Sequence, residues 1–146
     1  MAAAIATMTI YRDEPVIERL YEQGSKLAAG VNAAIAAHGL QKHVRLFGRP
    51  CCLAYGTLDE AGQPSQAFRT LFLQETIRRG VLMPSLVVSY THSDTDIART
   101  VDAIDGALGI YVRALNDGVG SYLTGRPSQV VYRRFNEAPT YPPAMR

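Results

Sequence analysis

The sequence predicts an α+β domain in which long helices cover a small, largely antiparallel sheet. Two long stretches, residues 16–39 and 97–118, repeat apolar residues at helical spacing, and short β-type runs bounded by turn residues lie between them. The chain has 146 residues, of which 47% are apolar and 19% are charged. A chain of this length and composition can bury a core, so we expect one folded domain.

Helix formers fill the start of the chain, and residues 2–11 are predicted to form a helix. Asp13 is expected to cap the helix that follows, over residues 16–39. Charged side chains of this second helix lie on the side opposite its apolar positions. Gly24 and Gly30 each weaken a helix by up to ~1 kcal/mol relative to alanine, so we expect something to pack closely against them.

Two short β-type runs, 44–48 and 51–57, predict two strands or one strand with a bend. Cys51 and Cys52 are adjacent in the second run, where a vicinal disulfide would distort a strand. We therefore expect reduced thiols that serve as small apolar core residues, and no further cysteine or paired histidine supplies zinc ligands. A helix over residues 65–79 is expected to be covered on more than one side, because its apolar residues do not share one stripe.

Residues 81–83 and 86–90 are again β-type runs and are predicted to be strands. Pro84 and Ser85 interrupt them, and the chain is expected to bend there because proline lacks an N–H donor. The order of elements is then helix, helix, strand pair, helix, strand pair, helix. This order is typical of helices layered on a small sheet.

Ser93 and Asp96 have the spacing of a capping box, which predicts that the second long helix begins there. Its apolar periodicity ends near residue 118, and the sequence beyond is rich in proline. We therefore predict a domain over residues 1–118 and an extended tail over residues 119–146.

Charge and hydropathy argue against two classes of partner. A formal net charge of +2 with scattered arginines is too small for a nucleic-acid-binding face. No apolar run reaches the ~20 residues of a membrane span, so we expect no membrane partner and a cytoplasmic protein. The three histidines lack metal-binding spacing, and neither a nucleophile elbow nor a phosphate-binding loop occurs. The residues alone indicate no complete catalytic constellation.

Two stretches of sequence, GVLMPS at 80–85 and SYTHSDTDI at 89–97, resemble the end of class III aminotransferases, especially the glutamate-1-semialdehyde 2,1-aminomutases. The second stretch is more specific, because it matches the family in both residue type and spacing. The upstream elements follow the order that the family uses, so the likeness runs from residue 1 to about residue 116. The resemblance implies the small domain of a fold-type I pyridoxal-phosphate enzyme.

In that family, pyridoxal phosphate forms a Schiff base with a lysine, and a large domain holds most of the cofactor. The resemblance places this lysine upstream of the segment that residues 2–8 match. Neither Lys26, on a polar helix face, nor Lys42, after a helix end, is expected to replace it. The chain alone is therefore predicted to hold no pyridoxal phosphate and to be inactive. The expected partners are the large cofactor-binding domain and further copies of the chain in a homo-oligomer.

By analogy with the loops that border the family's active site, four positions are expected to face the substrate in a complete enzyme: Arg49, Met83, Pro84 and Ser85. Between Ser85 and Ser89 the aminomutase pattern has a longer loop with a glutamate, which this sequence lacks. A general aminotransferase-like activity is therefore favoured over the aminomutase reaction. A second hypothesis is a stand-alone binding or assembly module that keeps the small-domain fold and self-associates through apolar helix faces.

Overall fold

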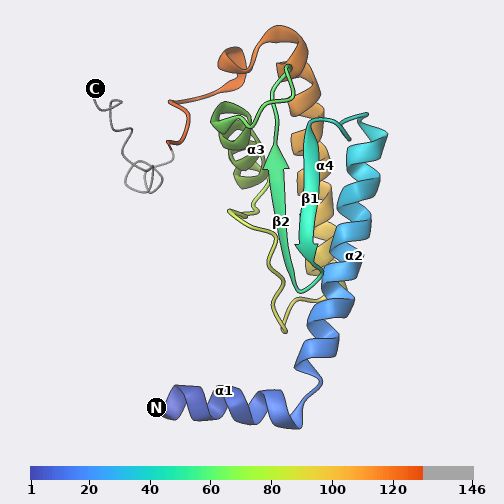
Figure 1. The fold of residues 1–146 in the computed structure, drawn as a ribbon, viewed down its shortest axis with the longest axis vertical. Coiled ribbons are helices and arrows are strands. Elements are labelled where there is room, and N and C mark those ends of the chain that lie inside the picture. The colour runs from blue at the N-terminus through green and yellow to red at the C-terminus, as the bar shows by residue number, and fades with distance from the viewer. Residues whose placement is uncertain (130–146) are drawn as a thin grey trace, which may run out of the picture.

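The computed structural model describes residues 1–129, and it confirms the α+β architecture (Figure 1). A two-stranded antiparallel hairpin lies in front of a layer of helices, and a first helix projects away from this body. In chain order the elements are α1 (Ala2–Asp13), α2 (Val16–Ala37), β1 (Val44–Arg49), β2 (Cys52–Thr57), α3 (Gln66–Arg78), α4 (Asp94–Asp117) and the 3-10 helix η1 (Val119–Tyr122).

The hairpin of β1 and β2 turns between Arg49 and Cys52, which are partners in the strand register. This register leaves Pro50 and Cys51 as the two-residue connection, so Cys51 lies in a turn and not in a strand. Cys52 is exposed, because alternation along β2 directs Leu53 into the core and its neighbour outward. The expectation of core cysteines was therefore wrong, and both thiols are free.

The core lies between one face of the hairpin and the helices α2, α3 and α4 (Figure 1). Tyr111 of α4 is fully buried at its centre, with its ring 4.6 Å from the ring of Phe68. Its hydroxyl donates a hydrogen bond to the carbonyl of Leu58 at 2.6 Å, which satisfies the one polar atom that this side chain buries. The core also includes Leu27, Val31, Leu53, Tyr55, Leu71, Phe72, Ile104 and Leu108.

The close packing expected at two glycines of α2 is confirmed. A Cβ added to Gly24 would overlap the carbonyl oxygen of Pro50, far inside van der Waals contact. A Cβ on Gly30 would lie 2.6 Å from a methyl carbon of Val101 in α4. The missing side chains therefore allow the hairpin turn and α4 to approach the backbone of α2 directly.

Asp13 does not cap α2, so that prediction was wrong. Helix α1 continues through Asp13, whose carboxylate pairs with Arg12 at 2.6 Å. The residue at the cap position of α2 is Pro15, which has no side-chain hydrogen bond to offer. The two helices are consequently joined by a short, sharp link.

The second predicted strand pair was also wrong. Residues 81–83 and 86–90 form no ladder, and their one sheet contact is an isolated antiparallel bridge between Leu53 and Leu86. The N–H of Leu86 donates to the carbonyl of Leu53 at 3.3 Å. Pro84 has no N–H to continue such a ladder, so the β-type sequence remains irregular although its chain runs beside β2.

Residues 119–129 lie against α3, and Gln74 holds them by a two-point hydrogen bond. Its side-chain amide donates to the carbonyl of Tyr122 at 2.9 Å and accepts the N–H of Thr124 at 2.9 Å. The tail expected after the domain therefore begins with a segment that contacts a helix. The boundary itself stays a prediction, and residues 130–146 lie outside the described part of the chain.

A buried carboxylate fixes the end of α3. Glu75 is 4% exposed and receives ion pairs from Arg78 at 2.6 Å and from Arg79 at 2.8 Å. Burial raises the pKa of Glu75, but the hydrogen bonds from Arg79 and Gln74 and the charge of Arg78 outweigh burial, so its pKa lies below the ordinary value. The charged form of Glu75 is therefore the one that stabilises the fold.

Replacing Gly24 by alanine is expected to lower the free energy of unfolding by about 1–3 kcal/mol, because the new methyl group must displace the turn at Pro50. Urea denaturation measures the change. Gly120→Ala is the matched control, since nothing lies within 4 Å of a Cβ added at that position. Equal stability of the two variants would contradict the packing described for α2.

Glu75→Gln is expected to lower the free energy of unfolding at pH 7 by about 1–3 kcal/mol, because two arginines lose their buried partner. The pKa of Glu75 is lower in the folded than in the unfolded protein, where it is about 4.3, so its ionised carboxylate stabilises the fold at pH values above about 4.3. This stabilisation is lost as the pH falls through the pKa that Glu75 has in the folded protein. The difference between wild type and variant should therefore shrink in acid. Urea titrations at several pH values measure it, with the exposed Glu60→Gln as control. A difference independent of pH would count against this account.

Candidate functional site

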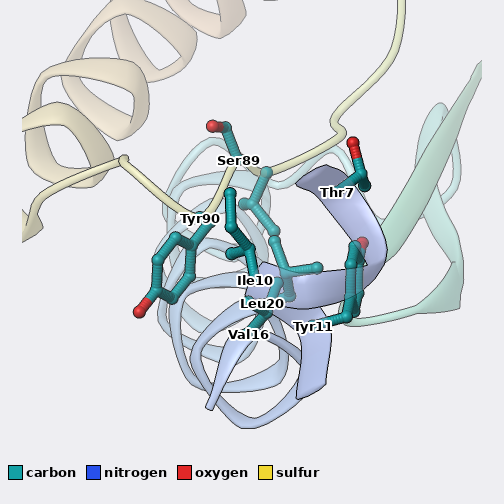
Figure 2. A pocket seen from close by; sticks show the side chains of 8 residues that line it. Thr7, Ile10, Tyr11, Val16, Leu20, Ser89 and Tyr90 are labelled. Carbon is teal, nitrogen blue, oxygen red and sulfur yellow. The ribbon is translucent and has the colours of Figure 1, made fainter. Parts of the chain in front are cut away.

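The segment of residues 81–92 passes between two hollows of the surface. The larger, which we call the α1 hollow, has a volume of about 320 Å³ and lies where α1 meets the body (Figure 2). Figure 2 shows Ile10 of α1 close to Val16 and Leu20 of α2, with Ser89 and Tyr90 on the facing segment. Its remaining lining residues are Thr7, Tyr11 and Val88.

The smaller hollow, which we call the His92 hollow, has a volume of about 170 Å³. It lies between the same segment and the helices α2 and α4, and Val88 borders both hollows. Its lining residues are Leu27, Val81, Leu82, Met83, Ser85, Leu86, Val87, Val88, His92, Ile97 and Thr100.

Two side chains hold the bend of the segment by its backbone carbonyls. The Tyr55 hydroxyl of β2 donates to the carbonyl of Met83 at 3.2 Å, and Arg69 of α3 donates to the carbonyl of Pro84 at 2.9 Å. The guanidinium carbon of Arg69 also lies 5.1 Å from the centre of the Tyr55 ring, and burial raises the pKa of that phenol. The bend is therefore clamped from the sheet and from a helix.

The motif residues 89–92 form a tight turn that leads into α4. The N–H of Ser89 donates to Nδ1 of His92 at 3.1 Å, and the Ser89 hydroxyl lies 3.0 Å from that of Thr91. Tyr90 points to the other side, where its hydroxyl donates to Glu14 at 2.6 Å and this hydrogen bond raises the pKa of the phenol. The turn therefore links the body to the junction of α1 and α2.

The predicted capping box at the start of α4 is confirmed. The Ser93 hydroxyl accepts the N–H of Asp96 at 3.2 Å, and Asp96 accepts the N–H of Ser93 at 2.8 Å. The Ser93 hydroxyl also donates to the Asp96 carboxylate at 2.7 Å, and this hydrogen bond, together with the one from the Ser93 N–H, holds the pKa of Asp96 below its ordinary value. Asp94 meanwhile accepts hydrogen bonds from Gln23 at 2.8 Å and from Lys26 at 2.9 Å. The SxxHSDxD sequence thus acts here as a turn, a cap and a link to α2.

Three of the four positions expected to face a substrate are consecutive in the sequence and lie in one loop. Met83 is buried with its carbonyl held by a side chain, whereas Pro84 and Ser85 are exposed, and Ser85 lines the His92 hollow. Arg49 lies apart at the end of β1, is exposed, and lines neither hollow. That these residues face a substrate stays a prediction.

Sequence reasoning missed Tyr55 and Arg69, the two residues that position this loop. Alternation in β2 identifies Tyr55 as a core residue, but nothing local indicates that its hydroxyl reaches residue 83. Arg69 occupies an ordinary helical position, and its target is 15 residues away. Contacts of this kind depend on how α3 packs on β2, which no spacing within the sequence encodes.

Within residues 1–129, no group of three or more histidine, cysteine or acidic side chains is placed to hold a metal ion. In the same part of the chain, no helix combines the length and the apolar character that crossing a membrane requires.

The sequence matches no known protein-family model. The fold, however, is similar to a solved structure, the pyridoxal-phosphate internal aldimine form of the FumI protein of Sphingopyxis sp. MTA144, with a TM-score of 0.66 and 27% identity. The match covers 79% of this chain and 27% of that chain. This chain therefore has the fold of part of a pyridoxal-phosphate-dependent protein and spans about a quarter of its length.

The two hollows described above do not by themselves fit pyridoxal phosphate. A Schiff base needs the amine of a lysine, and the chain has two, Lys26 and Lys42. The Lys26 ammonium pairs with Glu22 at 2.8 Å and with Asp94 at 2.9 Å, which raises its pKa. Lys42 is exposed in the turn after α2. Neither lysine borders the two hollows, and their linings contain no arginine within residues 1–129.

Replacing Arg69 by glutamine is expected to loosen the bend at residues 83–85, because the Pro84 carbonyl loses a charged donor. The N–H of Leu86, which follows the bend, should exchange with solvent about tenfold faster. Hydrogen exchange followed by NMR measures this rate. Arg45→Gln, at an exposed position of β1, is the matched control. Unchanged exchange at Leu86 would show that Arg69 does not position the loop.

Proposed function

We propose that this chain is the small domain of a pyridoxal-phosphate-dependent enzyme of the class III aminotransferase type, working in the cytoplasm with a larger part that holds the cofactor. The observation that carries the proposal is its likeness to a quarter of FumI, a protein whose structure contains pyridoxal phosphate as an internal aldimine. The resemblance of residues 80–97 to the family's small-domain motif supports the same assignment.

The apolar surface of α1 and of residues 81–88 supports a partner that covers it. None of the residues of α1 is buried, although several are apolar. Among these, Ile5 and Met8 are 60% and 72% exposed. Leu82 and Val87 are exposed beside the two hollows at 76% and 52%. An isolated helix of this length is marginal in water, and contiguous apolar surface marks an interface. We assign this surface to the cofactor-holding part.

In the assembled enzyme, pyridoxal phosphate supplies the electron sink and the larger part supplies the Schiff-base lysine. The role of this chain is then to border the substrate. Arg49, which is exposed and forms no ion pair within residues 1–129, would attract a substrate carboxylate from the end of β1. The clamped loop of Met83, Pro84 and Ser85 would border the substrate on another side. No acid lies between Ser85 and Ser89, which favours amino-group transfer between substrates over the aminomutase reaction.

The second candidate function is a self-associating assembly module. The same exposed residues of α1 favour it, because a second copy of the chain could cover them. Sedimentation velocity at several concentrations separates the two candidates. A single, well-defined dimer supports the module, whereas apolar aggregation without a defined stoichiometry supports a domain separated from its larger part.

The proposed function is tested by purifying the tagged chain from its native cells and reducing the preparation with borohydride. We expect pyridoxal phosphate to accompany the chain, with the pyridoxyl-lysine located by mass spectrometry outside residues 1–146. Absence of pyridoxal phosphate from a preparation that contains a stoichiometric partner would contradict the proposal.

The purified chain alone, mixed with pyridoxal phosphate and borohydride, is expected to show no selective labelling of Lys26 or Lys42. Lys26 is held by two carboxylates and Lys42 is an exposed surface amine. Lys42 should be labelled to the same extent in the wild type and in a Lys26→Arg variant. Lys26 should likewise be labelled equally in the wild type and in a Lys42→Arg variant. A stable aldimine absorbance that one of these variants abolishes would overturn the assignment of the Schiff base to another part.

A further inference from the structure

We propose that the His92 hollow is a binding site for a short-chain carboxylate. The ligand's apolar tail would occupy the interior, and its carboxylate would lie at the mouth between Ser85, His92 and Arg99. The test needs only this chain. In the proposed enzyme, Leu82 and Val87 of the same lining would also contact the cofactor-holding part, so the ligand would lie at that interface.

The interior of the hollow is apolar. Leu27, Met83, Leu86, Val88 and Ile97 line it, and each is 6% exposed or less. Its volume of about 170 Å³ is well below the roughly 300–1,000 Å³ of sites for drug-sized ligands. The space therefore suits a chain of a few carbons.

Polar groups at the rim are available for the ligand's head. The Ser85 hydroxyl makes no hydrogen bond to another residue within 1–129. Nδ1 of His92 already accepts the N–H of Ser89 at 3.1 Å, so Nε2 carries the hydrogen in the neutral ring and is the donor left over. Thr100 donates its own hydroxyl hydrogen to the carbonyl of Asp96 at 2.8 Å. The two remaining donors call for an acceptor, as a carboxylate provides.

An exposed cation, Arg99, lies beside one end of the segment that lines the hollow, although it is not itself a lining residue. A guanidinium nitrogen of Arg99 lies 3.2 Å from where a Cβ on Gly80 would be, next to Val81 at the start of the lining segment. Arg99 forms no ion pair within the described residues. The carboxylate of Asp96, one turn before it, is engaged by the N–H and the hydroxyl of Ser93. The charge of Arg99 acts on Asp96 without a direct ion pair within residues 1–129, so its guanidinium nitrogens are available to an incoming carboxylate.

The test is an NMR titration of the full chain with butyrate, following methyl groups and amides. We expect saturable shifts confined to residues that line the hollow, among them Leu27, Val88 and Ile97. Butyramide, which has the same shape without the charge, and inorganic phosphate, which lacks the tail, should each bind more weakly. Arg99→Gln should weaken butyrate binding about tenfold, whereas Arg45→Gln, on the hairpin, should leave it unchanged.

Three outcomes would overturn the proposal. Shifts that stay linear to the highest butyrate concentration would exclude a specific site. Equal binding of phosphate would remove the role of the apolar interior. Equal effects of Arg99→Gln and Arg45→Gln would reduce the interaction to non-specific attraction. Should Arg99→Gln unfold the protein, Ser85→Ala provides a second variant, for which weaker binding is expected and unchanged binding counts against the proposal.

Discussion

The direct approach of α4 to α2 at Gly30 is the contact on which the other elements depend. Because Gly30 has no side chain, Val101 packs onto the backbone of α2, and the two helices cross closely enough to share a core with the hairpin. The same crossing carries the start of α4 to Gln23 and Lys26, which both bond to Asp94. The segment that precedes α4 must therefore return along the sheet to reach this point.

That constraint explains why residues 81–92 are irregular and yet ordered. Their two ends are fixed by α3 and by the cap of α4, and proline within them prevents a ladder. Backbone carbonyls without strand partners need other donors, and Tyr55 and Arg69 supply them at Met83 and Pro84. The resulting loop separates the α1 hollow from the His92 hollow, so the irregularity creates the surface features that a ligand or partner can use.

The likeness to a pyridoxal-phosphate protein assigns only part of that protein's structure to this chain. The described residues provide a clamped loop, an exposed Arg49 and apolar surface, but no lysine placed for a Schiff base. In the division proposed above, the reactive groups belong to another part and this chain, folded around its own core, supplies bordering groups. Its exposed apolar residues are the feature from which a partner is inferred.

The sequence by itself determined the helices, the hairpin and the capping box at Ser93, because periodicity, turn residues and capping act over a few neighbouring residues. It indicated that something packs closely on Gly24, but not that the contact is the turn at Pro50. It did not determine whether β-type residues 81–90 would find a strand to pair with, or that Cys51 would lie in a turn. Those outcomes follow from strand register and from how α3 lies on β2. They involve groups far apart along the chain, so only the tertiary structure could decide them.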